Sequence, residues 1–205
     1  MLALPGIPAD RTAAMTRSGA AILLHLANSA ELQGWLNISI EADYLTTTPD
    51  YLRLADQLPL QVQARVQEVG LSTIIGNDRT TAGGLEHGGA IGGLTVYTDK
   101  SLFVAHRTCF FHEYGHFLFF ELGWPEDSFE QIFLEESNNL KEILGDHAMS
   151  GYTEYFAEFF EHYLDGKKAP DDMAKLKAAA PKTWNYFASL EANNWGLAEP
   201  ALEAN

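Results

Sequence analysis

Residues 109–120, Cys-Phe-Phe-His-Glu-Tyr-Gly-His-Phe-Leu-Phe-Phe, are the stretch that decides the fold and the chemistry of this chain. The pattern predicts a helix from about Ser101 or Ala105 to Leu122, which Gly123-Trp124-Pro125 ends. Because this helix is apolar nearly all round, we expect it deep inside the protein. Three polar side chains lie within it, and burying them without a partner would cost several kcal/mol, roughly.

Those three side chains have the spacing H-E-x-x-H, with His112 and His116 four residues apart and Glu113 between them. Residues four apart share one face of a helix, so both imidazoles can reach one Zn²⁺ at about 2.0–2.1 Å. Glu113 can then take a proton from a metal-activated water. The alternative is that ordinary core hydrogen bonds satisfy the two histidines. Gly115, in the middle of the motif, is expected to let another element approach closely.

A third zinc ligand must come from further along the chain. Glu135 and Glu136 have the spacing of thermolysin-like enzymes, but the residues around them are typical of an exposed face. Glu154 and Glu158 lie in an aromatic helix that we expect from Thr153 to just before Gly166. Being four residues apart, they share a face, so that one can bind zinc and the other can orient a ligand histidine. The alternative for Glu154 is an acid favoured by the dipole of the first helical turn.

The composition sets limits on the class of protein. The 205 residues suffice for a single domain, with residues 1–45 as a helical and strand leader packed on the body and residues 46–205 as the zinc domain. A net charge of −15 argues against a nucleic-acid partner. Residues 121–165 hold twelve acids and one base, which indicates either a solvated face or a cleft wall that prefers basic peptides.

The rest of the pattern predicts an α+β fold with a small, mostly antiparallel sheet packed on helices. Strands are expected at residues 35–40, 71–75 and 94–98, and a glycine-rich loop at residues 76–93. Helices are expected at residues 12–28, from Pro59 to about Val69, through the acidic region to about Leu144, and from Pro181 to about Asn193.

Location is less well defined by the sequence. No apolar run is long enough to span a bilayer. Residues 19–27 resemble the apolar part of a signal peptide, but they are few, include His25 and begin late, so we interpret them as part of a helix. The only cysteine, Cys109, is interpreted as a small buried hydrophobic residue.

The chain resembles the anthrax lethal factor-like zinc metallopeptidases, a group that includes the Pro-Pro endopeptidases. The resemblance covers about residues 56–190 and depends on three blocks: Leu58-Pro59 through Gly70-Leu71-Ser72-Thr73-Ile74-Ile75, the His112–His116 motif, and Thr153-Glu154-Tyr155-Phe156-Ala157-Glu158-Phe159 with the later Ala180-Pro181-Lys182-Thr183.

The resemblance implies a zincin-like peptidase domain with the following roles. Glu154 would be the third zinc ligand and Glu158 a supporting carboxylate. Residues 94–98 would form an edge strand, on which Leu94 and Val96 bind an extended peptide. The family has a tyrosine seven residues before the ligand glutamate, where it stabilises the oxyanion, whereas this chain has His147 there. Imidazole can donate to the same charge, and Tyr152 is the substitute candidate.

The sequence therefore predicts a zinc endopeptidase acting on peptide or protein substrates, in a secreted or delivered effector rather than a resident cytoplasmic protein. Two other classes of protein stay open. One is a module that binds zinc and a protein partner without catalysis, and the other is a structural protein without metal. The cleavage sequence, the biological target and the oligomeric state cannot be predicted.

Overall fold

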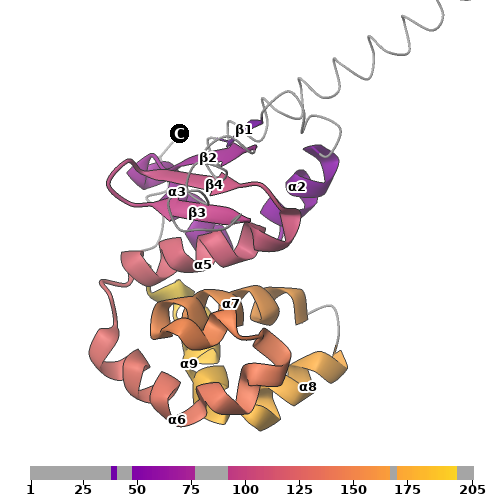
Figure 1. Ribbon diagram of the computed structural model, residues 1–205. Helices are drawn as coiled ribbons and strands as arrows, with labels where there is room; N and C mark the ends of the chain where they lie inside the picture. Colours follow the sequence, from indigo (N-terminus) through magenta and orange to yellow (C-terminus); the bar gives the residue numbers. More distant parts are fainter. Residues whose placement is uncertain (1–37, 41–47, 77–91, 167–169, 198–205) are drawn as a thin grey trace, which may run out of the picture.

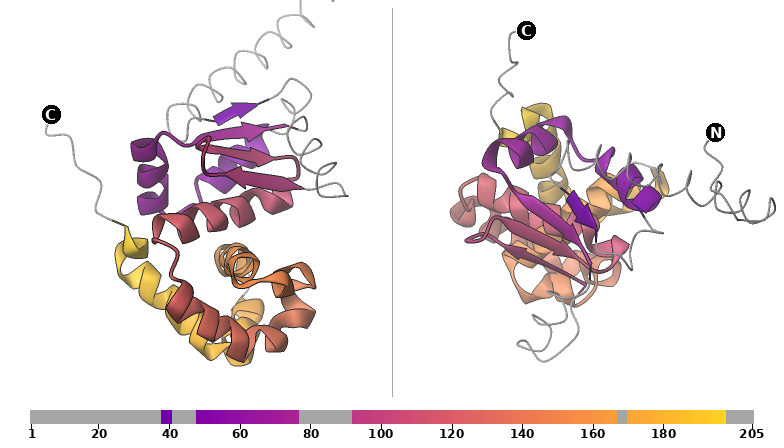
Figure 2. Two further views of the ribbon diagram at one scale, coloured as in Figure 1. Left: turned by 60° about the vertical axis from the view of Figure 1, so that its left-hand side comes forward. Right: turned by 90° about the horizontal axis from the view of Figure 1, so that it is seen from above.

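The computed structural model describes residues 38–40, 48–76, 92–166 and 170–197. These residues form a small sheet with α5 along one face and a layer of further helices beyond α5 (Figures 1 and 2). The helix expected at residues 12–28 and most of the glycine-rich loop at 76–93 lie outside the described residues. The α+β class is confirmed. Within the described residues, no helix is long and apolar enough to cross a membrane.

The sheet has four strands in the order β1-β2-β4-β3. Their bounds are Ile38–Ile40 for β1, Ser72–Ile75 for β2, Gly93–Val96 for β3 and Ser101–Val104 for β4. β1 and β4 both pair with β2 in parallel, and only β3 and β4 are antiparallel. The expectation of a mostly antiparallel sheet was therefore wrong. Long connections separate the parallel strands, and α2 (Thr48–Ala55) and α3 (Leu60–Val69) lie between β1 and β2. Of the described strands, only β3 and β4 are joined by a tight turn.

β4 was not predicted, because the pattern from about Ser101 or Ala105 onwards indicated a helix. Residues 101–104 instead fill the position between β2 and β3, with Leu102 and Val104 fully buried. A short 3-10 turn, η2 (Arg107–Cys109), then leads into α5 (Phe110–Glu121). Four residues of alternating burial are enough for a central strand. From the sequence alone, however, so short a pattern cannot be distinguished from the start of a helix.

α5 lies between the sheet and the helical layer. Nine of its twelve residues are buried, as its apolar composition predicted. On the sheet side, Tyr114 Oη and Thr73 Oγ1 of β2 are hydrogen-bonded at 2.7 Å. On the other side, α5 crosses α7 (Tyr152–Gly166) so closely that a Cβ on Gly115 would lie 2.7 Å from Ala157 Cα. The close approach expected at Gly115 is thus present, and it brings the two helices expected to hold a metal together.

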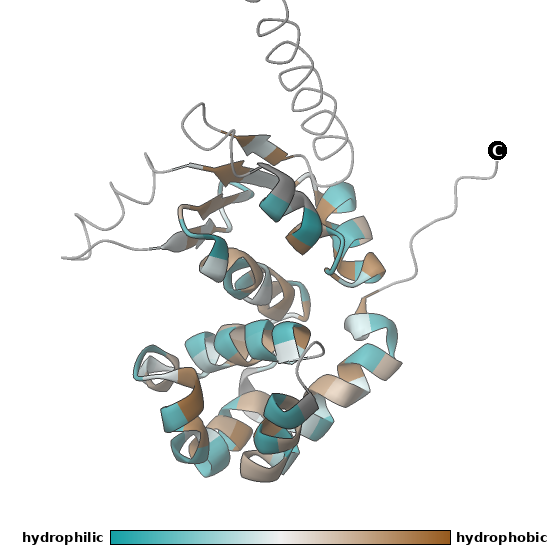
Figure 3. Cartoon of the chain, turned by 90° about the vertical axis from the view of Figure 1, so that its right-hand side faces the viewer, coloured by the Kyte–Doolittle hydropathy of each residue, from teal (hydrophilic) through white to brown (hydrophobic). Residues whose placement is uncertain are grey.

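The helical layer consists of α7, α6 (Glu126–Leu144), α8 (Pro170–Ala179) and α9 (Pro181–Ala192), followed by the 3-10 turn η4 (Asn194–Gly196). These helices carry hydrophilic and hydrophobic residues on the same ribbon, as amphipathic helices do (Figure 3). Their core is aromatic, and its fully buried members include Phe119, Phe129, Tyr155, Phe156, Phe159, Phe160 and Phe187.

Glu136 corrects the expectation of an exposed face at residues 135–142. Glu135 is exposed, but Glu136 is only 5% exposed and accepts hydrogen bonds from the backbone N–H groups of Lys182 and Thr183. It also accepts a hydrogen bond from the hydroxyl group of Thr183. A carboxylate from α6 therefore caps the first turn of α9, which explains why an acid is buried there without a role at the metal motif.

Candidate metal centre

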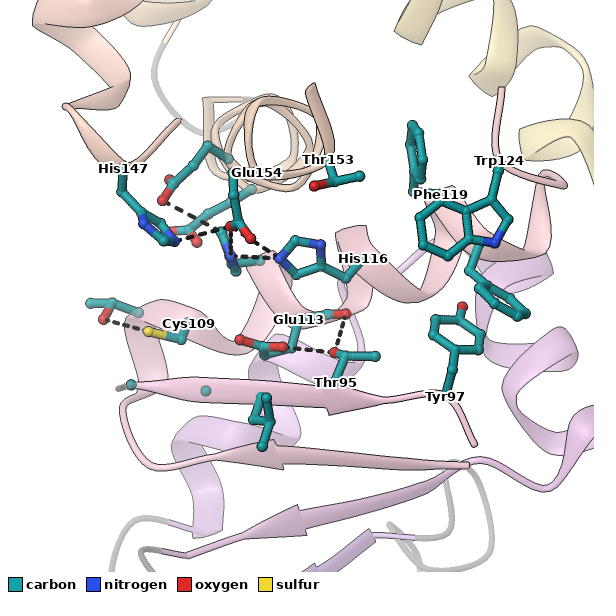
Figure 4. Close-up of a pocket in the computed structure, with 18 residues that line it drawn as sticks. Thr95, Tyr97, Cys109, Glu113, His116, Phe119, Trp124, His147, Thr153 and Glu154 are labelled. Carbon is teal, nitrogen blue, oxygen red and sulfur yellow. Dashed lines mark hydrogen bonds and ion pairs between the residues drawn. The ribbon is translucent and has the colours of Figure 1, made fainter. Parts of the chain in front are cut away.

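α5 and α7 present the polar side chains of the motif to each other. His112 and Glu113 are 7% and 4% exposed, and His116 lies one turn further along the same face of α5. Glu154, Glu158 and Glu161 follow one another along a face of α7 at spacings of four and three residues. The crossing at Gly115 and Ala157 allows these two faces to meet (Figure 4).

Three of these side chains converge on one point. Nε2 of His112 and Nε2 of His116 lie 3.0 Å apart, and each lies 3.2 Å from Glu154 Oε2. Although Glu154 Oε2 is buried, it makes no hydrogen bond of good geometry. This buried carboxylate oxygen lacks a hydrogen bond although imidazole nitrogens of His112, His116 and His147 surround it, so the group could hold a metal ion.

The donor set fits zinc in number, type and spacing. Two imidazole nitrogens and one carboxylate oxygen are the ligands of many catalytic zinc sites, which keep a fourth position open. Bond lengths of about 2.0–2.1 Å in a tetrahedron separate the ligand atoms by about 3.3–3.4 Å. The observed separations of 3.0–3.2 Å are close to that value.

A second group in the same place shares His112. His147 and Glu158 lie near enough to its ring that the three could also hold a metal ion. Nδ1 of His112 lies 3.4 Å from Glu158 Oε1 and makes no hydrogen bond of good geometry. This is the side of the ring on which a ligand histidine ordinarily meets a supporting carboxylate.

The charges of the centre are strongly coupled. Burial alone would lower the pKa of His112, but Glu154 and Glu158 outweigh it and raise this pKa to about 10. Burial alone would raise the pKa of Glu154, but His112 and His116 hold it well below its usual range. Without metal, His112 therefore carries a proton that a bound cation would displace.

Glu113 sits on the other side of the motif, against β3. Its Oε2 accepts a 2.7 Å hydrogen bond from Thr95 Oγ1. A Cβ on Gly93 would collide with Oε1 of Glu113 and lie 2.6 Å from its Cγ. Burial raises the pKa of Glu113, while His116, His112 and the Thr95 hydrogen bond act in the opposite direction. A carboxylate with a raised pKa beside a metal site suits a general base.

The centre opens into a cleft of about 870 Å³ between β3, α5 and α7. At one end the lining is aromatic, from Tyr97, Phe119, Phe120 and Trp124. Glu158 and Glu161 line it as well, and burial together with Glu158 raises the pKa of Glu161 to about 8. Cys109 also lines the cleft, so its thiol is only half-buried.

β3 borders this cleft as an edge strand. Backbone N–H groups of Ser72 and Gly76 bond to the carbonyls of Lys100 and Val104, so the even-numbered residues of β4 point their peptide groups to β2. The peptide groups of the odd-numbered residues then point to β3, as the bond from Ala105 N to Gly92 O shows.

The register pairs these odd-numbered residues with Leu94 and Val96. The peptide groups of Leu94 and Val96 therefore point towards β4, and those of Gly93 and Thr95 point to the outer edge. Leu94 also lines the cleft, whereas Val96 does not.

His147 and Tyr152, the two candidates for stabilising an oxyanion, lie in different places. His147 is in the 3-10 turn η3 (His147–Ser150), lines the cleft and has Nε2 at 3.0 Å from Glu154 Oε2. Tyr152 packs at the edge of the aromatic core, with its ring centroid 5.9 Å from that of Phe119, and does not line the cleft.

Thr95, Gly93 and Glu161 were not identified from the sequence as residues of the site. The spacing of Glu161, three residues after Glu158 and seven after Glu154, places it on the same helical face and could have revealed it. No pattern could have revealed Thr95 or Gly93, because their contact with Glu113 depends on which strand borders α5.

Comparison with known proteins supports the sequence resemblance at the level of the domain. No curated protein matches the chain. Residues 99–190, a little under half of the chain, match the family described as anthrax toxin lethal factor, N- and C-terminal domain. This span includes both helices of the candidate metal centre. Over residues 99–190 the chain is therefore similar to a lethal factor-like domain.

Proposed function

We propose that this protein is a zinc-dependent endopeptidase with a zincin-like catalytic domain. The observation that carries the proposal is the convergence of His112, His116 and Glu154 from two crossing helices around a buried carboxylate oxygen that lacks a hydrogen bond. The family match over residues 99–190 supports it, since proteases are known in that family.

Each residue of the centre has a role in this proposal. His112, His116 and Glu154 hold Zn²⁺, and Glu158 orients the ring of His112 through Nδ1. When bound there, Zn²⁺ supplies a Lewis acid for the scissile carbonyl and lowers the pKa of a water molecule. Glu113 takes the proton of the attacking water and returns it to the leaving amine, for which its raised pKa is favourable.

The oxyanion that forms at the scissile carbonyl needs a donor from the protein. His147 is the better of the two candidates, because it lines the cleft beside Glu154 while Tyr152 does not line it. An imidazole N–H aimed at the developing charge can do the work for which the family uses a tyrosine hydroxyl.

The substrate in this proposal is an extended peptide that pairs with the outer edge of β3. The peptide groups of Gly93 and Thr95 face that edge, so these two residues would form the hydrogen bonds to the peptide, while substrate binding by Leu94 and Val96 stays a prediction. Glu158 and Glu161 line the cleft, and the negative charge that Glu161 gains as pH rises through about 8 favours basic peptides. The toxin family suggests a secreted or delivered effector.

A Glu113→Gln variant tests the proposal against the alternative, a zinc-binding interaction module without catalysis. Glutamine keeps the shape of the side chain but cannot act as a base, so zinc should stay bound at one ion per chain while peptide turnover disappears. Glu135→Gln, on the exposed face of α6, is the matched control and should retain turnover.

The assay is cleavage of a diverse peptide library by zinc-loaded protein, followed by mass spectrometry, with zinc measured by elemental analysis. Zinc binding without any cleavage by the wild type would favour the interaction module. Protein without stoichiometric zinc would refute both and favour a structural role.

A further inference from the structure

We propose that Thr95 is a positioning residue for Glu113, through which the strand expected to receive the substrate also aligns the general base. The inference rests on the proposed function, because it assigns Thr95 a role in the same reaction. It depends on three observations: a hydrogen bond, a close approach and the direction of a strand's peptide groups.

The hydrogen bond is specific for the carboxylate. Thr95 Oγ1 lies 2.7 Å from Glu113 Oε2 and 3.1 Å from the carbonyl oxygen of Glu113, but the hydroxyl has only one proton to donate. The carbonyl belongs to the hydrogen-bond ladder of α5, whereas the carboxylate carries the charge and makes the shorter contact. In the described part of the chain, no other side chain hydrogen-bonds to the Glu113 carboxylate.

The close approach is made possible by Gly93, two residues earlier on the same face of β3. The Glu113 side chain occupies the space that a Cβ on Gly93 would fill, with the carboxyl carbon only 2.7 Å from that position. Glu113 can therefore lie against β3 because Gly93 has no side chain there, and the hydroxyl group of Thr95 holds it in that place. With Oε2 engaged by Thr95, Oε1 remains to accept a proton.

The strand direction connects this contact to the substrate. The side chain of Thr95, and the Cβ position of Gly93, face α5, on the same side of the sheet as the buried Leu102 and Val104 with which these residues pair. Their peptide groups face the outer edge of β3, beside the cleft. A peptide that pairs with this edge would hydrogen-bond to the backbone of the residue whose hydroxyl holds the base. The strand that would receive the substrate therefore also holds Glu113 in place.

Two substitutions at Thr95 separate the hydroxyl from the shape of the side chain. Thr95→Val keeps the shape and removes the donor, and Thr95→Ser keeps the donor and removes a methyl group. Thr73→Val is the matched control, because Thr73 is also a strand threonine hydrogen-bonded to α5, at Tyr114, but lies outside the cleft.

We expect Thr95→Val to lower kcat about 10- to 100-fold, the range for losing a hydrogen bond to a charged group, with KM close to that of the wild type. Thr95→Ser should recover most of the turnover, and Thr73→Val should lower the unfolding temperature without changing kcat. All variants should bind zinc at wild-type stoichiometry. In crystals of metal-free Thr95→Val, the Glu113 carboxylate should move away from β3.

Turnover by Thr95→Val equal to that of the wild type would overturn the inference, as would a loss of turnover that Thr95→Ser does not repair. An inactive wild type would instead refute the proposed function. In that case the crystals decide: a Glu113 carboxylate that keeps its place in Thr95→Val shows that Thr95 does not position it.

Discussion

Replacing Gly115 by alanine should damage the candidate metal centre without changing any of the proposed metal ligands. The added Cβ would lie 2.7 Å from Ala157 Cα, about 0.7 Å inside the 3.4 Å at which ordinary contact begins. Because the obstacle is backbone, α5 and α7 must separate. A separation of this size would extend the 3.2 Å contacts of Glu154 Oε2 to about 4 Å, beyond the spacing of about 3.3–3.4 Å that tetrahedral zinc requires.

The zinc affinity should therefore fall by at least about 10- to 100-fold. A loss of this size is typical when residues that support a metal site are mutated. Overpacking should lower the free energy of unfolding by about 1–3 kcal/mol. The higher helix propensity of alanine offsets up to about 1 kcal/mol of this loss. Competition with a chelator measures the affinity, and thermal unfolding of the metal-free protein measures the stability.

Gly151→Ala is the matched control, because Gly151 has an extended backbone and nothing within 4 Å of its Cβ position. A second substitution, Ala157→Gly in the Gly115→Ala background, should restore little, since the closest contact is with Cα rather than Cβ. Wild-type zinc affinity in Gly115→Ala would refute the reasoning that the helix crossing sets the spacing of the ligands.

Two further predictions concern acids outside the metal ligands. The folded-state pKa of Glu161 is raised to about 8, so this carboxyl supports stability at low pH and loses that contribution as pH rises from about 4.5 through 8. In the metal-free protein, Glu161→Gln should therefore flatten the fall in unfolding temperature between pH 6 and pH 9, roughly, and an unchanged fall would contradict the shift. Removing the cap of α9 by Glu136→Ala should cost about 1–2 kcal/mol without loss of zinc. The exposed Glu135→Ala should leave the free energy of unfolding almost unchanged in the same denaturant titration, and a loss equal to that of Glu136→Ala would contradict the cap.

Most helices of the described residues could be predicted because local chemistry marks their ends. Pro59 precedes α3, and Gly70, with φ of 70°, provides the left-handed residue that closes it. α2 and α8 were not predicted, and residues 170–179 of α8 lack a clear apolar stripe. The sheet was predicted less well: the pairing of β2 with β4 rather than β3 depends on contacts between distant residues, which single-strand patterns do not encode.

The candidate site divides in the same way. His112 and His116 could be proposed as ligands because one helical turn separates them, and Glu154 and Glu158 because charges within an aromatic helix need a reason. Only the resemblance then singled out Glu154 as the ligand. Glu136 was misjudged, because its partners are backbone groups of α9, forty-six and forty-seven residues away. The contact of Thr95 with Glu113 likewise exists only once the edge strand lies against α5. Sequence spacing thus predicts partners on one element, and the fold must provide those that join two.

His147 is where this limit matters most for the chemistry, since it belongs to a group that could itself hold a metal with His112 and Glu158. The side chain of His147 is 66% exposed, whereas those of His116 and Glu154 are 20% and 27% exposed. We therefore expect the metal to bind His116 and Glu154 rather than His147. We therefore expect His147→Ala to keep wild-type zinc affinity while kcat falls about 10²- to 10³-fold, the loss typical of one oxyanion donor. His147→Tyr, which introduces the residue of the family, should retain more turnover than alanine. His116→Ala should lose zinc. If His147→Ala loses zinc and His116→Ala keeps it, the metal belongs to the second group, and the oxyanion must be stabilised by another donor of the cleft.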